Sequence, residues 1–466
     1  TAAYRERRVT PTQLLQKLLR EAETIARKQP WLRCFWMRDD ATALREAESA
    51  SLRYAEGRPL GPLDGVPFAV KEHVGIRGFP CRAGHDLPSD ELSPDDATVV
   101  ARLRQAGAIL VGQTAMTELG LSPLGINPKR PALRNPHHLE RVAGGSSTGS
   151  GIAVALGLVP FAIGTDGGGS VRIPAALCGV FGLKPTYGRV SRAGGKLPGS
   201  LTHVGPIASS VVDLAHFLDA VASPDPRDSS TLRAPAAQGR SFAEATRRRV
   251  RGLTLGIDEY ELRDAEPDVA RAVEQSIKAI ETCGVRLLDV RLPLASSAFA
   301  VGSVTIMAET RAAEALDFQR HAAAFGFDLQ ALLALSAQLS SQDYLRAQKL
   351  RERMRKQLAR VFEEVDALAL PTTQYTAPLV TATEERYGRV DAVATTRMCR
   401  HTFLANLVGL PAGSAPIGVD REGLPIGLQL LADAWDEHTV LALMAELSRL
   451  GVARSARPPY HVELLA

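Results

Sequence analysis

Neither sign of charge dominates this sequence. Its 466 residues carry 55 lysines and arginines against 51 aspartates and glutamates, which leaves a formal net charge of +4. A protein that attracts nucleic acid or an anionic membrane through its overall field needs a much larger basic excess. We therefore expect no nucleic-acid partner and no membrane partner.

Cysteine is scarce. The five cysteines are odd in number, lie far apart and form no C-x-x-C pair: Cys34, Cys81, Cys178, Cys283 and Cys399. These spacings exclude a disulfide framework and a paired-cysteine zinc site, so we predict free thiols and a cytoplasmic location. His137 and His138 lie near Glu140, but no H-E-x-x-H motif or third ligand accompanies them. We expect solvent-facing histidines and no metal site.

Long apolar runs are also absent. No stretch approaches 18 uninterrupted apolar residues, and no charged-then-apolar segment opens the chain. A membrane-spanning helix and a secretory signal are therefore not expected. Because the first residue is Thr1, the sequence leaves open whether a native N-terminal segment is missing.

What the sequence does contain is a succession of helix and strand patterns. Thr10 and Gln13 form a capping box at the start of an apolar face with helical spacing. Residues 253–290 read as strand, helix and strand, an order that favours a parallel strand pair with the helix on one face of the sheet. Residues 413–430 read as a hairpin. The patterns predict an α/β fold.

A later segment, residues 344–365, is a predicted helix rich in basic side chains. Its apolar side includes Met354 and Leu358, while Arg346 and Arg351 are assigned to the opposite side. Acidic residues interrupt the basic ones, so we interpret this side as a solvated face and not as a surface for RNA or lipid.

The most informative stretch covers residues 144–189. It holds two loops of small residues, GGSSTGS from 144 to 150 and GGGS from 167 to 170, with apolar residues between them. The first loop is not a phosphate-binding P-loop, because Ser150 stands where that motif requires lysine. No G-x-S-x-G motif surrounds Ser170. A serine that leaves a glycine turn at a helix start is surrounded by unpaired amides, which suit a developing oxyanion.

Four blocks in this order resemble the amidase signature family: GPLDGVPFAVKE (61–72), GGSSTGSG (144–151), GTDGGGSVRIPA (164–175) and GLKPTYGRVS (182–191). The resemblance extends over about residues 10–450. It implies one α/β domain over residues 1–466, with a central mixed, mostly parallel twisted β-sheet covered by helices on both faces. The signature core is expected at about 61–220, and residues 222–240 are expected to form a surface loop.

The same resemblance implies a Ser-Ser-Lys triad. Ser170 is the expected nucleophile, Ser146 the bridging serine with a cis peptide bond, and Lys71 the base; the spacing to Ser170 favours Ser146 over Ser147. The amides of the glycine turn, from Gly167, Gly168, Gly169 and Ser170, are expected to form the oxyanion hole. Gly120 and Ser147 are assigned to substrate binding.

Elementary chemistry agrees with these roles. A serine hydroxyl is a weak nucleophile without an adjacent base, and a lysine is a base only when its amine is neutral. Lys71 follows the apolar run 66–70, which reads as a buried strand, so we expect burial to lower its pKa. Asp166 and Arg172 are expected to form a buried polar scaffold for the loops.

The sequence departs from the commonest family pattern at Gly167, Thr148 and Glu72, which leaves the pocket and substrate open but not the reaction class. The resemblance implies hydrolysis of a small-molecule amide with no metal or organic cofactor. The alternatives are a glutamine-hydrolysing subunit of a tRNA-dependent amidotransferase, an esterase or carbamoyl hydrolase, and a catalytically silent binding protein. The acyl group, the amine, the pathway and the formation of a homodimer stay open.

Overall fold

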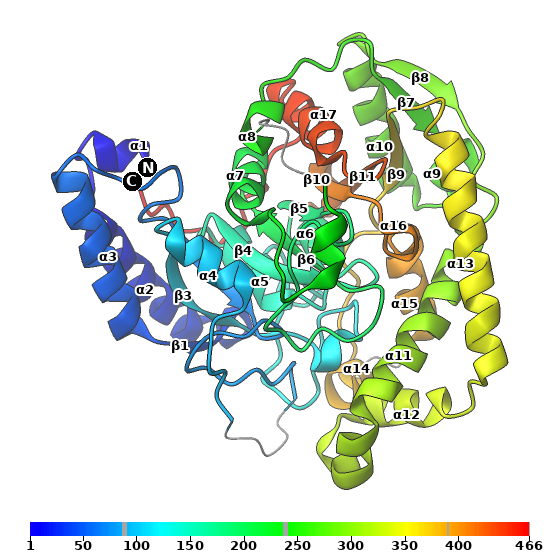
Figure 1. The fold of residues 1–466 in the computed structure, drawn as a ribbon, viewed down its shortest axis with the longest axis horizontal. Helices are drawn as coiled ribbons and strands as arrows, with labels where there is room; N and C mark the ends of the chain where they lie inside the picture. The colour runs from blue at the N-terminus through cyan, green and yellow to red at the C-terminus, as the bar shows by residue number, and fades with distance from the viewer. Residues whose placement is uncertain (86–90, 236–240, 389–390, 466) are drawn as a thin grey trace.

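The computed structural model describes residues 1–85, 91–235, 241–388 and 391–465. Within these residues one mixed sheet of eleven strands crosses the molecule (Figure 1). From one edge to the other the strands are β1 (Phe35–Arg38), β3 (Ile109–Thr114), β2 (Pro67–Lys71), β4 (Phe161–Asp166), β6 (His203–Ala208), β5 (Phe181–Lys184), β10 (Ala412–Val419), β11 (Pro425–Ala432), β9 (Ala367–Pro371), β7 (Thr254–Ile257) and β8 (Arg286–Asp289).

Helices cover both faces of this sheet, because neighbouring strand residues point to opposite sides. In β2, Phe68 and Val70 join one apolar cluster while Ala69 joins another. Helices that contribute to the first cluster are α4 (Thr98–Gln105), α7 (Val211–Val221), α8 (Phe242–Ala245), α9 (Glu259–Arg263), α10 (Pro267–Glu281) and α17 (Glu437–Arg449). The opposite face is covered by α2 (Pro11–Lys28), α3 (Asp40–Ala55), α5 (Thr148–Ala155), α6 (Arg172–Leu177), α11 (Ala298–His321), α13 (Ser341–Val361), α15 (Ala392–Cys399) and α16 (Phe403–Val408).

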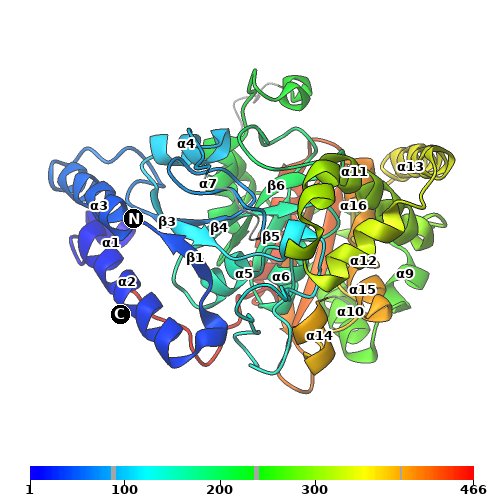
Figure 2. The ribbon, with the colours of Figure 1, turned by 90° about the horizontal axis from the view of Figure 1, so that it is seen from below.

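The remaining helices are short or peripheral. They are α1 (Ala2–Arg5), α12 (Phe327–Ser336) and α14 (Ala382–Tyr387). In both views α1 to α3 lie at one end of the molecule and α11 to α13 at the other (Figures 1 and 2). The described part of 222–240 contains a 3-10 turn, Ser229–Arg233, and the buried side chains Asp225 and Thr231; residues 236–240 lie outside the described residues.

The sheet is mixed, as expected, but its pairings are not mostly parallel. Four of the pairings between described strands are parallel and six are antiparallel. Parallel pairs occur where a helix returns the chain, as in β2-α4-β3 and β7-α10-β8. Consecutive strands without an intervening helix, β5-β6 and β10-β11, pair antiparallel. The expectation of a mostly parallel sheet gave too little weight to direct connections between consecutive strands, which produce antiparallel pairs.

Local sequence patterns predicted individual helices and strands more accurately than they predicted the direction of strand pairing. The capping box at Thr10 and Gln13 opens α2, and the predicted hairpin is β10-β11. The solvated face assigned to α13 is wrong at Arg351, which is 8% exposed. Its guanidinium donates hydrogen bonds to the carbonyl oxygen of Leu407 and to Ser200. A long side chain near an apolar stripe can bury its stem and still satisfy its charged end, which helical spacing does not reveal.

Candidate active site

The candidate site lies at the carboxyl ends of two neighbouring parallel strands. β2 ends at Lys71 and β4 ends at Asp166, with Val70 paired to Ile163. Because parallel strands end at the same edge of a sheet, Lys71 and Thr165 come together although they are far apart in the sequence. The glycine turn at 167–169 follows β4 directly, and α6 begins at Arg172.

Asp166 determines the shape of the glycine turn. One carboxylate oxygen accepts a hydrogen bond from the amide of Gly169 at 2.7 Å and the other accepts one from Val171 at 3.2 Å. From the opposite side, the hydroxyl of Thr402 donates to the carbonyl oxygen of Gly168 at 2.6 Å. These bonds fix the peptide between Gly168 and Gly169, so the turn is held before any substrate arrives.

The Asp166 carboxylate is itself held by a buried guanidinium. Arg172 donates to both of its oxygens at 2.9 and 3.0 Å, and both side chains are fully buried. Arg172 also donates to Asn406, at 2.6 Å, and to Gln429. Burial alone raises the pKa of Asp166, but Arg172 and Lys184 hold the pKa of that carboxyl well below its usual range. The buried polar scaffold predicted for this pair is therefore present.

Lys71 is completely buried and points at two hydroxyl groups. Its Nζ lies 2.7 Å from Ser146 Oγ and 2.7 Å from Thr165 Oγ1. Burial lowers the pKa of this amine from 10.5 to about 7, and the charge of Asp166, a smaller effect, acts to raise it. A lysine with this pKa is substantially neutral near neutral pH and can accept a proton.

Two residues of this arrangement were not predicted. Thr165 Oγ1 lies 3.2 Å from His73 Nδ1, so the contacts extend from Ser146 through Lys71 and Thr165 to His73. Burial, followed by Lys71, Lys196 and His85, lowers the pKa of His73 well below its usual value, which keeps the ring neutral. The available signals were the two-residue spacing of Lys71 and His73 and the position of Thr165 just before the glycine turn.

The serine doublet divides into two environments. The peptide bond between Gly145 and Ser146 is cis, as the resemblance implies. Ser146 presents its hydroxyl to Lys71, whereas the hydroxyl of Ser147 is fully buried against the backbone of Thr165, 3.3 Å from both its amide nitrogen and its carbonyl oxygen. The Ser147 side chain thus connects the two loops, and it does not line the cavity beside Ser170.

Ser170 is half-buried and lines a cavity of about 50 Å³ together with Gly120 and Gly168. Its carbonyl oxygen accepts a hydrogen bond from the amide of Ser147 at 3.3 Å. Within the described residues, no hydrogen bond joins the Ser170 hydroxyl to Ser146. Gly120, which lines this cavity with Ser170, is also adjacent to Ser146, since a Cβ atom placed on it would lie 3.2 Å from Ser146 Oγ.

The glycine amides differ in availability. The amide of Gly169 is already bonded to Asp166, which contradicts its assignment as an oxyanion donor and gives it the role of fixing the turn. The amides of Gly167, Gly168 and Ser170 have no hydrogen-bond acceptor within the described part of the chain. Donors without a protein acceptor are what an oxyanion hole requires.

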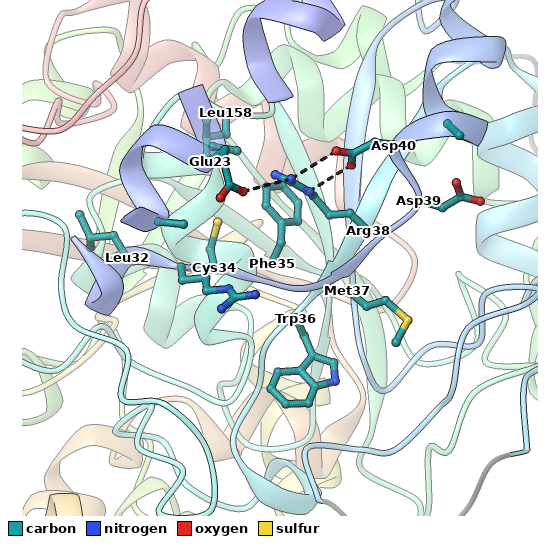
Figure 3. A pocket seen from close by; sticks show the side chains of 14 residues that line it. Glu23, Leu32, Cys34, Phe35, Trp36, Met37, Arg38, Asp39, Asp40 and Leu158 are labelled. Carbon is teal, nitrogen blue, oxygen red and sulfur yellow. Dashed lines mark hydrogen bonds and ion pairs between the residues drawn. The ribbon is translucent and has the colours of Figure 1, made fainter. Parts of the chain in front are cut away.

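Other features of the chain do not add to this site. A larger cavity, of about 540 Å³, lies beside β1 and contains none of the predicted site residues (Figure 3). Three of its charged groups are paired with one another, since Arg38 contacts Glu23 at 3.5 Å and Asp40 at 3.1 Å. His138 is exposed as expected, but His137 is half-buried, with Nε2 3.0 Å from the carbonyl oxygen of Cys178.

Over the described ranges, no group of three or more potential ligands from histidine, cysteine, aspartate or glutamate could hold a metal ion. Over the same ranges, no helix combines the length and the apolar character that crossing a membrane would need.

Comparison with known proteins identifies the family of this chain. A family model described as Amidase matches residues 13–441. A fatty acid amide hydrolase of Arabidopsis thaliana is 34% identical over 459 residues, 96% of this chain and 75% of that protein. A glutamyl-tRNA(Gln) amidotransferase subunit of Chloroflexus aurantiacus is 36% identical over 459 residues, 92% of each chain. A solved peptide amidase in complex with chymostatin has a TM-score of 0.85 and 28% identity over 98% of this chain and 97% of that one. The chain therefore belongs to the amidase signature family and is an amide hydrolase.

Proposed function

We propose that this protein hydrolyses small-molecule carboxylic amides through an acyl-enzyme on Ser170. The single observation that carries the proposal is the buried Lys71 amine, which lies 2.7 Å from the Ser146 hydroxyl and has a pKa lowered to about 7. Such an amine can accept a proton near neutral pH, and a serine bonded to it can pass that proton on.

In the acylation step, Lys71 accepts the proton of Ser146 while Ser146 accepts the proton of Ser170. The Ser170 oxygen forms a bond to the amide carbon, and the negative charge on the carbonyl oxygen is stabilised by amides of the glycine turn. The Lys71 ammonium then returns its proton through Ser146 to the amide nitrogen as the C–N bond breaks. The amine leaves and an ester on Ser170 remains.

In the deacylation step, water attacks the ester carbon and gives its proton to the same pair of groups. The bond to Ser170 breaks, the serine oxygen recovers a proton, and the carboxylic acid leaves. This route requires the Ser170 hydroxyl to come within hydrogen-bond distance of Ser146 in the substrate complex, because catalytic hydrogen bonds are often loose without substrate. No step requires a metal or an organic cofactor.

The test is a panel of simple amides assayed with the wild type and the Ser170→Ala variant. We expect kcat/KM of the variant to be at least 1,000-fold lower than that of the wild type while its folding is unchanged. We also expect mass spectrometry of the quenched wild type to find an acyl group on Ser170. Ser147→Ala removes a nearby hydroxyl that bonds the backbone of Thr165 and does not face the cavity, so we expect it to lose less kcat/KM than Ser170→Ala. Equal turnover by wild type and Ser170→Ala would refute the proposal.

A second candidate function is glutamine hydrolysis as part of a tRNA-dependent amidotransferase. It is favoured by the similarity to the amidotransferase subunit of Chloroflexus aurantiacus, which extends over 92% of both chains. Glutamine is therefore included in the panel. Ser170-dependent turnover of glutamine well above that of simple amides would favour this second function.

A further inference from the structure

The cavity beside Ser170 is walled mainly by apolar side chains. Five of its residues belong to three separate helices: Phe299, Ile306 and Met307 on α11, Leu332 on α12 and Phe403 on α16. The polar side chains among the lining are the neutral Ser170, Ser303, Thr395 and Cys399, and no charged side chain of the described residues lines the cavity. A ligand group that enters here meets hydrocarbon and a few hydroxyl or thiol groups.

The apolar wall is in direct contact with the predicted oxyanion turn. A Cβ atom placed on Gly168 would lie 2.5 Å from the ring of Phe403, and one placed on Gly167 would lie 3.2 Å from Cδ1 of Ile306. Phe403 is in turn held edge-on by Phe299, with ring centroids 5.8 Å apart. At position 168 the Phe403 ring leaves no room for a side chain, whereas at position 167 a methyl group would meet only the flexible end of Ile306.

Electrostatics decide what such a cavity can accept. A carboxylate or ammonium group brought here would lose its hydration without gaining an ion-pair partner, which is strongly unfavourable. An aliphatic group would instead exchange water for the side chains of α11 and α16, which is favourable. The free volume of about 50 Å³ suits a short aliphatic group.

We infer that the substrate carries a short, uncharged apolar group next to the scissile amide, and that this group occupies the cavity formed by Phe299, Ile306 and Phe403. The inference rests on the proposed function, because it assigns the substrate class of the same site. The inference predicts that free glutamine is a poor substrate, because its carboxylate and ammonium groups would have no ion-pair partner in this cavity.

The experiment compares two amides of nearly equal length. Butanamide ends in a methyl group where succinamate, the monoamide of succinate, ends in a carboxylate. We expect kcat/KM for butanamide to exceed that for succinamate and for glutamine by at least 100-fold, with all turnover abolished in Ser170→Ala. Ser170-dependent turnover that is equal for the three amides, or greater for succinamate or glutamine, overturns the inference and leaves the acyl-enzyme chemistry on Ser170 intact; a preference for glutamine would favour the second candidate function.

A charge introduced into the wall provides the matched test. Ile306→Lys places a cation at the cavity, whereas Leu316→Lys places one on the same helix at a side chain that is 63% exposed. We expect Ile306→Lys to reduce the preference for butanamide over succinamate at least 10-fold and Leu316→Lys to leave it unchanged. An unchanged preference in both variants overturns the assignment of this cavity. Ser170-independent turnover, or none of any amide, overturns the proposed function and this inference with it.

Discussion

Lys71 allows a quantitative prediction because its burial affects stability as well as reactivity. Folding lowers the pKa of the amine from 10.5 to about 7. At about 1.4 kcal/mol per pKa unit, keeping this amine buried costs up to about 5 kcal/mol, and that full cost applies only at and below about pH 7, where the amine is protonated in the folded state as well. Between pH 7 and 10.5 the unfolded state binds more protons at this site than the folded state does. The contribution of Lys71 to the free energy of unfolding therefore becomes less unfavourable as the pH rises, by up to about 1.4 kcal/mol per pH unit.

The informative variant is Lys71→Met, which retains an unbranched side chain and removes the titrating group. It also removes the two hydrogen bonds at 2.7 Å to Ser146 and Thr165, each of which contributes about 0.5–1.5 kcal/mol. At pH 7 the stability gained by removing the burial penalty of the amine exceeds the stability lost with the two hydrogen bonds. We therefore expect the variant to be more stable than the wild type by about 2 kcal/mol. At pH 10 nearly all of the burial penalty has disappeared, and we expect the variant to be less stable by about 1 kcal/mol.

The assay is urea-induced unfolding of both proteins at several values between pH 7 and 10, with the difference in free energy of unfolding plotted against pH. Other titrating groups largely cancel in this difference, and His73 stays neutral because its pKa lies well below 6.5. Lys349→Met, which removes an exposed lysine on α13, is the control and should give a difference that does not change sign. A constant difference between wild type and Lys71→Met over this range would refute the lowered pKa and the proton-accepting role built on it.

Three further outcomes follow from the same geometry. The kcat/KM for an uncharged amide should rise with pH, with a midpoint near the pKa of about 7 of Lys71, and then level off, because only the neutral amine accepts a proton; a flat profile from pH 6 to 9 would contradict this. Gly168→Ala should lower kcat/KM at least 10-fold, since its new methyl group would lie 2.5 Å from the Phe403 ring, and Phe403→Leu in the same chain should restore part of the loss in the same assay. Asn406→Leu should lower the free energy of unfolding by about 2–3 kcal/mol in urea, because it removes the acceptor at 2.6 Å from the buried Arg172; an unchanged midpoint would show that this bond is dispensable.

The sequence predicted best those features that depend on residues close to one another in the chain. The capping box of α2, the β7-α10-β8 unit and the hairpin β10-β11 depend on residues close to one another, and each was predicted with small errors at its ends. The meeting of Lys71 with Ser146 followed only from the family resemblance, because nothing local relates two residues 75 positions apart.

Other features depend on tertiary contacts that no local pattern contains. The Gly169 amide donates its hydrogen bond to Asp166, although the sequence of the glycine turn suggested that this amide would be free to bind an oxyanion. Thr165 and His73 join Lys71 because β2 and β4 are neighbours in the sheet, and strand order was not predictable from spacing. Arg351 is buried because Leu407 and Ser200 come from distant parts of the chain to accept its hydrogen bonds.

The guanidinium of Arg172 has a consequence for how this protein can be divided. It joins the end of β4 to Asn406 on α16 and to Gln429 on β11, more than 230 positions later in the chain. A fragment ending near residue 220 would contain Ser146 and Ser170 but would leave this cation in the interior without three of its four partners, Thr402, Asn406 and Gln429. Moving the N-terminal fragment alone into another protein should therefore fail. Replacing the segment that contains α11 and α12 would instead alter the cavity wall and leave the hydrogen bonds of Arg172 in place.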